Sequence, residues 1–271
     1  MASAQCCENA PTLLASSCGA GHVEDFRGLK TYISGSPHSK LGILLVSDVY
    51  VFACCNSLQL QEKRKNGWGM VKKTKPRKKE KLADKVAAVG FFVVVPDFFH
   101  GEPLIPNNPD RPFQAWIKDH SAEKASEDAK PVIEALKKKG VSKIGVAAFC
   151  WGAKVAVILA KHACINVAVL LHPSFVTLDD IQGVEVPISI LGAEIDQLSP
   201  PELLEQFDQV LKAKNEAKTN KSGFEVDAFV KIYPGVSHGW TVKYNSEDAE
   251  AAKRAEEAHK DMLDWFVKYI C

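Results

Sequence analysis

The stretch KIGVAAFCWGAKVAVILAKH, residues 143–162, decides the fold of this chain. Its first part, Ile144 to Ala148, is a short apolar run that predicts a buried strand. Its second part, Gly152 to His162, is longer and predicts a helix. Cys150 falls on the tight turn between them, at the carboxyl end of a strand, where open α/β sheets place their functional sites.

The residues around Cys150 suit a turn that exposes a nucleophile. Such a turn needs small residues two positions before and two after, and Ala148 and Gly152 meet this requirement. The N-terminus of the following helix favours a thiolate, and the N–H of Trp151 is placed to donate to an oxyanion. The alternative is a packing role, because free cysteines are among the most often buried residues.

The rest of the chain alternates short apolar runs with longer amphipathic stretches. Strands are predicted at 29–34, 41–47, 91–96, 143–148, 166–171, 187–192 and 227–233, and helices at 80–90, 122–140, 152–162, 201–214 and 246–270. Gly90 and Gly140 are placed to cap helix C-termini, and Ser246 is placed to cap an N-terminus. The alternation predicts an α/β fold with a mostly parallel central sheet and helices on both faces.

Two further residues follow predicted strands of the same sheet. Asp196 lies in LGAEIDQLSP, residues 191–200, and His238 lies in YPGVSHGW, residues 233–240. With Cys150 they give the chain order nucleophile, acid, base, which is the order of α/β-hydrolases. Taken singly, Asp196 reads as a loop cap and His238 as a surface histidine.

Five segments together carry a family resemblance: FCWGAK (149–154), GAEIDQLSP (192–200), YPGVSHGW, LLVSDVY (44–50) and VVVPDFFHGEP (93–103). They resemble the dienelactone hydrolase family, particularly its plant members, over about residues 23 to 270 except for one segment. The resemblance implies an α/β-hydrolase fold with Cys150 as nucleophile, His238 as base and then acid, and Asp196 orienting the imidazole.

The resemblance also implies roles for neighbouring residues. Asp48 matches an acid that holds the resting thiol, and Val49 matches a second oxyanion donor beside Trp151. The expected pocket residues are Phe99, His100 and Trp240. The activity implied is hydrolysis of a small ester or lactone through an acyl-enzyme, with no cofactor and no metal.

The chain departs from the family at the substrate-binding positions. Gly101 and Val242 stand where the best-studied branch has two arginines that hold a carboxylate, which argues against dienelactone itself. Lys243 and His100 leave a different acidic group open as the substrate. Some plant relatives are labelled mixed-linkage β-glucanases, but no carboxylate pair of the kind glycoside hydrolysis needs can be singled out in this sequence.

A second departure is an atypical segment at residues 51–80, which reads as an insertion. Seven of the thirteen residues from Lys72 to Asp84 are Lys or Arg. Three interpretations stay open: a basic loop at 72–81 for RNA, membrane or an acidic partner, a nuclear-import signal, or non-functional sequence from alternative splicing, which we favour. Val51 replaces a glycine beside the oxyanion loop, so the alternative function is a weak or inactive isoform that acts as a binding or regulatory protein.

Composition limits the remaining possibilities. The 271 residues carry 34 Lys and Arg against 33 Asp and Glu, so no global charge favours nucleic acid or a membrane surface. The eight cysteines show no disulfide or zinc spacing, and the N-terminus lacks the pattern of a signal peptide. We expect a mobile segment at 1–22, one domain at 23–271, a cytoplasmic location and a small-molecule ester or lactone as partner; the sequence leaves the oligomeric state open.

Overall fold

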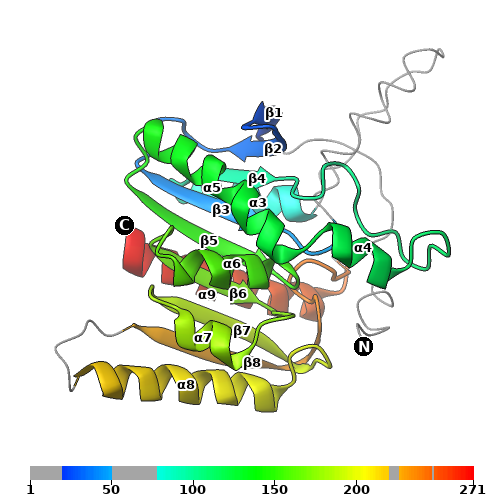
Figure 1. The fold of residues 1–271 in the computed structure, drawn as a ribbon, viewed down its shortest axis with the longest axis vertical. Coiled ribbons are helices and arrows are strands. Elements are labelled where there is room, and N and C mark those ends of the chain that lie inside the picture. Colours follow the sequence, from blue (N-terminus) through cyan, green and yellow to red (C-terminus); the bar gives the residue numbers. More distant parts are fainter. Residues whose placement is uncertain (1–19, 51–77, 220–225, 246) are drawn as a thin grey trace.

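The fold is built on one eight-stranded sheet, seen in a computed structural model that describes residues 20–50, 78–219, 226–245 and 247–271 (Figure 1). The strand order is β1-β2-β4-β3-β5-β6-β7-β8. The strands are β1 (His22–Phe26), β2 (Leu29–Ser34), β3 (Leu41–Val46), β4 (Phe92–Pro96), β5 (Lys143–Phe149), β6 (Val167–Leu171), β7 (Ile188–Ile195) and β8 (Ala228–Ser237).

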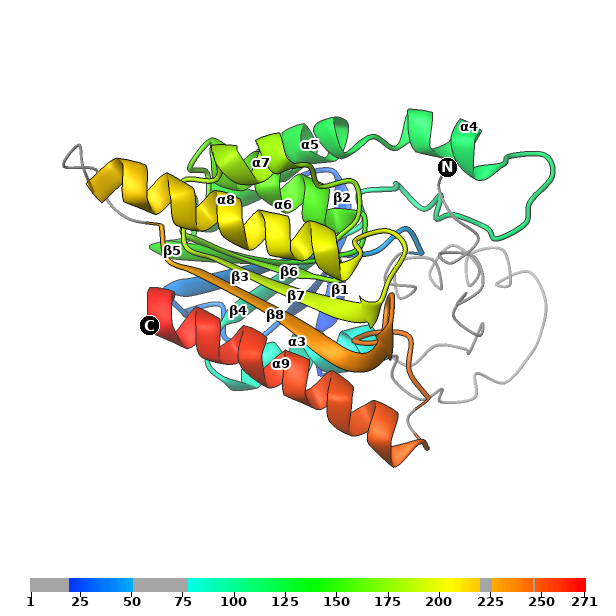
Figure 2. The ribbon, with the colours of Figure 1, turned by 90° about the horizontal axis from the view of Figure 1, so that it is seen from below.

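The pairing directions bring the strand ends that matter to one edge of the sheet. β2 is antiparallel to β1 and to β4, whereas every pair from β4 to β8 is parallel. The carboxyl ends of the parallel strands therefore share an edge, and Figure 2 shows β7 and β8 ending at the same side. Cys150, Asp196 and His238 each come directly after the last residue of β5, β7 and β8.

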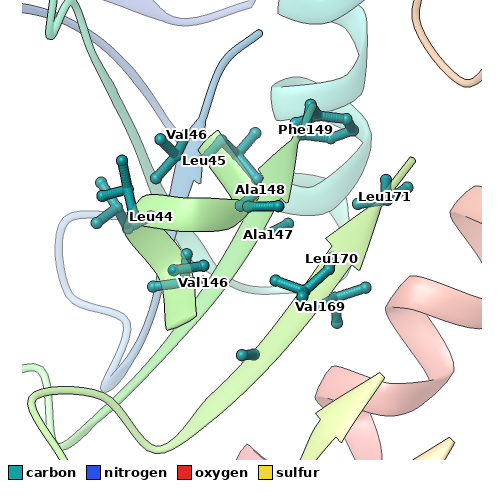
Figure 3. Packing of buried hydrophobic residues seen from close by; sticks show 14 of the residues in the cluster. Leu44, Leu45, Val46, Val146, Ala147, Ala148, Phe149, Val169, Leu170 and Leu171 are labelled. Carbon is teal, nitrogen blue, oxygen red and sulfur yellow. The ribbon is translucent and has the colours of Figure 1, made fainter. Parts of the chain in front are cut away.

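The centre of the sheet is apolar on both faces. Side chains of β3, β5 and β6 pack together there, as Figure 3 shows for residues such as Leu44, Val146 and Leu170, all of which are fully buried. A parallel strand covered on both sides needs apolar residues at consecutive positions rather than at alternate ones. This requirement explains the continuous apolar runs that identify these strands in the sequence.

Helices cover both faces of the sheet. Figure 2 shows α5, α6, α7 and α8 on one face and α3 and α9 on the other. The helices are α3 (Lys78–Ala88), α4 (Phe113–Asp119), α5 (Ala122–Lys138), α6 (Gly152–Lys161), α7 (Leu178–Gly183), α8 (Pro201–Thr219) and α9 (Ala249–Ile270). Gly90 and Gly140 follow α3 and α5 with φ of 112° and 90°, so they end these helices as expected.

All seven predicted strands and all five predicted helices are present, with ends shifted by a few residues. Within the described residues, three short elements were not predicted: β1, α4 and α7. The predicted cap at Ser246 is wrong, because Asp248 caps α9 by accepting hydrogen bonds from the N–H groups of Glu250 and Ala251.

Parts of two predicted segments fall outside the described residues, namely 1–19 of the N-terminal segment and 51–77 of the insertion. Of what remains, His22 already belongs to β1, and the last residues of the insertion belong to α3, which begins at Lys78. Among the helices of the described ranges, none combines the length and the hydrophobicity needed to cross a membrane.

Candidate active site

The turn that carries Cys150 has the strained backbone expected of a nucleophile between a strand and a helix. Cys150 has a φ of 52°, in the left-handed region that a non-glycine residue rarely occupies. Its N–H donates to the carbonyl of Leu171 at 3.1 Å, and its own carbonyl accepts from the N–H groups of Ala153 and Ser174, each at 3.1 Å. These three bonds hold the strained residue in place.

Close packing explains the small residue after the turn. A Cβ on Gly152 would lie 2.7 Å from the carbonyl oxygen of Val46 and 2.8 Å from that of Ser47. Both contacts are with backbone, which cannot move aside cheaply. The start of α6 therefore packs directly against the end of β3, and Gly152 makes this approach possible.

His238 and Asp196 form a buried pair at the same edge. The Nδ1 of His238 donates to Oδ2 of Asp196 at 2.7 Å, and both side chains are fully shielded from solvent. The other oxygen, Oδ1, accepts from the N–H groups of Leu198 at 2.8 Å and Ser199 at 3.3 Å. The carboxylate is thus fixed on both oxygens, and it directs Nε2 of the imidazole away from itself.

The electrostatics of His238 link it to Cys150. Burial would lower the pKa of His238, but the nearby negative charge of Cys150 and the hydrogen bond to Asp196 outweigh burial and raise this pKa to about 10. The structure therefore brings together the three residues that the sequence predicts as a triad. An imidazole with this pKa stays protonated beside the sulfur at neutral pH.

Two residues that were not among the predicted site residues lie in the same cluster. The hydroxyl oxygen of Ser174 is 3.3 Å from the sulfur of Cys150. The ring of His172 packs edge-to-face on His238, with ring centroids 5.0 Å apart, and its Nε2 is 2.8 Å from the hydroxyl of Thr241. A signal for both existed in the sequence, because they follow β6, the strand that pairs with β5.

Asp48 and Val49 follow β3 at this edge, where the resemblance places them. Asp48 is fully buried, with Oδ1 accepting from the N–H of Tyr50 at 3.2 Å and Oδ2 lying 4.0 Å from Nζ of Lys243. The carbonyl of Val49 accepts from the N–H of Leu104 at 3.0 Å, which fixes this loop. The role of Asp48 as the holder of the resting thiol stays a prediction.

The three expected pocket residues take different positions. Trp240 lines a cleft of about 390 Å³ together with His238 and Lys243. Phe99 is fully buried, and its ring lies 4.6 Å from that of Trp151. His100 has a half-exposed side chain whose Nε2 is 3.5 Å from Oδ2 of Asp128, a residue of α5. Contact of any of the three with a substrate stays a prediction.

Strand order, turn geometry and the placement of the three side chains define an α/β hydrolase. A model of the dienelactone hydrolase family matches residues 65–270, which is most of the chain. The chain belongs to the dienelactone hydrolase family.

Two curated proteins are similar to this chain in sequence, and a solved structure is similar to it in fold. A maize protein named endo-1,3;1,4-beta-D-glucanase is 37% identical over 189 residues, which cover 70% of this chain and 54% of the maize protein. A carboxymethylenebutenolidase homolog from Xenopus tropicalis is 29% identical over 256 residues, covering 92% and 91% of the two chains. The solved dienelactone hydrolase from Anabaena variabilis has a TM-score of 0.58 at 10% identity, covering 93% of this chain and 100% of its own.

Proposed function

We propose that this chain hydrolyses a small carboxylic ester or lactone, with Cys150 as nucleophile, His238 as proton donor and acceptor, and Asp196 as the group that orients the imidazole. The single observation that carries the proposal is the cluster at the carboxyl edge, where His238 is bound to Asp196 at 2.7 Å and has its pKa raised by Cys150. A protonated imidazole beside a thiolate is the resting state of an activated cysteine.

The first half of the reaction forms an acyl-enzyme. The thiolate sulfur of Cys150 bonds to the carbonyl carbon, and the carbonyl electron pair moves to the oxygen. As this oxyanion collapses, the carbon–oxygen bond to the leaving group breaks, and the Nε2 proton of His238 passes to the departing alkoxide. The acyl group is left on sulfur as a thioester.

The second half regenerates the enzyme. Neutral His238 takes a proton from water as the water oxygen attacks the thioester carbon, and collapse of the second oxyanion releases the acid and the thiolate. The charged imidazolium is then again beside the charged sulfur. The two half-reactions as written consume no oxidant, reductant or cofactor.

Two backbone amides support the proposed oxyanion site. Trp151 and Val49 follow Cys150 and Asp48, and in the described part of the chain neither N–H donates a hydrogen bond to another residue. A free N–H at the start of α6 also adds the partial positive charge of a helix N-terminus. Preorganised donors of this kind stabilise the charge that develops on the carbonyl oxygen.

The name of the maize relative raises glycoside hydrolysis as a second activity. That reaction needs two carboxyl groups that flank the scissile bond, one of them free to donate a proton. In this cluster Asp196 is already bound to His238 and to two backbone amides, and Asp48 faces Lys243. These engagements favour the thiol-based reaction.

The test uses three forms of the full-length chain with an activated aryl ester. We expect turnover in the wild type, loss of ~10³-fold or more in Cys150→Ala, and an unchanged rate in the control Cys164→Ala, whose cysteine lies beyond α6. A rate in Cys150→Ala equal to that of the wild type would refute the assignment. A wild type that binds the ester without turning it over would favour the binding or regulatory isoform instead.

A further inference from the structure

The loop after β6 brings a hydroxyl to the sulfur of the candidate nucleophile. The Oγ of Ser174 is 3.3 Å from Sγ of Cys150, across 24 residues of sequence, and Ser174 and Cys150 are each only 1% exposed. Nothing in the family resemblance assigns a role to this serine. A buried hydroxyl needs an acceptor for its single proton. The contact between this hydroxyl and the sulfur therefore needs a physical explanation.

The chemistry of the pair sets the direction of the hydrogen bond. A serine hydroxyl donates one proton and can accept two, whereas a thiolate only accepts. Within the described residues the sulfur is the one partner of this hydroxyl. When Cys150 is charged, Ser174 must therefore be the donor.

The loop holds this hydroxyl in a fixed position. The N–H of Ser174 donates to the carbonyl of Cys150 at 3.1 Å, and the carbonyl of Pro173 accepts from the hydroxyl of Ser199 at 2.7 Å. The two residues that flank the Pro173–Ser174 pair, His172 and Phe175, have φ of 40° and 63°. Strain at two non-glycine residues persists only where the surroundings enforce it, and such strain gathers at functional sites.

We propose that the Ser174 hydroxyl donates a hydrogen bond to the Cys150 thiolate and is a catalytic residue that keeps the sulfur ionised between turnovers. This inference rests on the proposed function, since it requires Cys150 to be the nucleophile. It gives the thiolate a neutral donor, Ser174 after β6, in addition to the charge of His238 after β8. On attack the sulfur loses its charge to the new carbon–sulfur bond, so the hydrogen bond from Ser174 favours the resting and released states.

Other titratable groups lie at the same edge of the sheet as the sulfur. His238, backed by Asp196, faces it from the ends of β8 and β7, and His172 packs on His238 from the end of β6. Asp48 and Lys243 lie at the end of β3 and in the loop after β8, 4.0 Å from each other. Replacing Ser174 by alanine changes none of these charges, so the variant isolates the effect of the hydroxyl on the ionisation of the sulfur.

The test measures alkylation of Cys150 by iodoacetamide across pH in the full-length chain, followed by mass spectrometry of the peptide that contains Cys150. We expect Ser174→Ala to shift the titration midpoint of alkylation up by about one pH unit, and to react about tenfold more slowly than wild type at pH values below the wild-type midpoint. The two rates should converge at alkaline pH, where the thiolate is complete in both proteins. A merely structural role would lower the rate at every pH.

The matched control is Ser189→Ala. Ser189 lies in β7, and its buried hydroxyl has no hydrogen-bond partner among the described residues, so its pH profile should coincide with that of wild type. A Ser174→Ala profile that equals wild type, or one that is slower by the same factor at all pH values, overturns this inference alone. A wild-type Cys150 that behaves as an ordinary thiol would overturn the proposed function as well.

Discussion

His238 donates from Nδ1 to Oδ2 of Asp196 at 2.7 Å, and neither side chain is exposed. The two residues are 42 positions apart in the chain, yet each directly follows the last residue of its strand. Because β7 and β8 are parallel neighbours, their ends meet at one edge and place the acid beside the base. The sheet itself thus brings the imidazole and the carboxylate together.

The raised pKa of His238 predicts the alkaline limit of activity. A histidine whose pKa is raised keeps its proton up to that value, so the imidazolium needed by the leaving group is present at neutral pH and is lost as pH rises through about 10. We expect kcat/KM for an aryl ester to hold from neutral pH and to fall only near this value. Rates are measured with Cys150→Ala as the background. A fall centred near the ordinary histidine pKa of about 6.5 would contradict the account.

Substitution of Asp196 tests whether its carboxylate causes the raised pKa of His238 and, with it, the alkaline limit of activity. Asp196→Asn removes a charge that holds the imidazolium, and its amide can also donate to His238 and fix the wrong tautomer. We expect kcat/KM to fall by ~10² to ~10⁴ and the alkaline limb to move to lower pH. Asp208→Asn is the control, because Asp208 pairs with Lys212 on the exposed side of α8. An unchanged alkaline limb in Asp196→Asn would show that the carboxylate does not support the imidazolium.

His259 predicts a pH dependence of stability that is separate from catalysis. Burial, with Lys85 nearby, lowers the pKa of His259 to about 4, while its Nε2 lies 3.0 Å from the carbonyl of Thr241. The unfolded chain binds this proton at about pH 6.5, so stability falls as pH drops from there toward 4. His259→Gln should lose about 2 kcal/mol less than wild type between about pH 7 and pH 5.

Chemical denaturation at the two pH values measures this difference in the free energy of unfolding. The comparison of variant with wild type isolates His259, since all other titrating groups are common to both proteins. Equal losses in the two proteins would mean that His259 does not resist protonation in the fold.

Gly152 predicts a stability cost at the turn. A methyl group there meets the backbone of Val46 and Ser47, so Gly152→Ala should destabilise the fold by about 1–3 kcal/mol. Gly183→Ala is the matched control, because its Cβ would meet only the flexible side chain of Lys161, at 3.0 Å, and should cost no more than about 0.5 kcal/mol. Denaturant midpoints of the two variants check this. Equal costs would show that the close approach of α6 to β3 is not required.

The parallel strands, and the placement of Cys150, Asp196 and His238 at one edge of the sheet, were predictable because their signals are local. The strands predicted at 143–148, 187–192 and 227–233 end two to five residues before Cys150, Asp196 and His238, so the sequence alone indicates that these residues share one edge of the sheet. α4 and α7 were missed, since helices of 7 and 6 residues are too short to show a periodic pattern. The place of Ser174 after β6 was visible in the sequence, but its contact with the sulfur was not, because the loop passes through a positive φ at His172 that this residue type does not signal.

The measurement that tests the central claim most directly is trapping of the acyl group on Cys150. The full-length chain is mixed with an aryl acetate, quenched with acid during the first turnover, digested and analysed by mass spectrometry. The account predicts one acetyl group on the wild-type peptide that contains Cys150. It predicts no acetyl group on the corresponding peptide of Cys150→Ala. Ester turnover in the wild type with no acyl group on Cys150 at any time, or with the group on another residue, would contradict it.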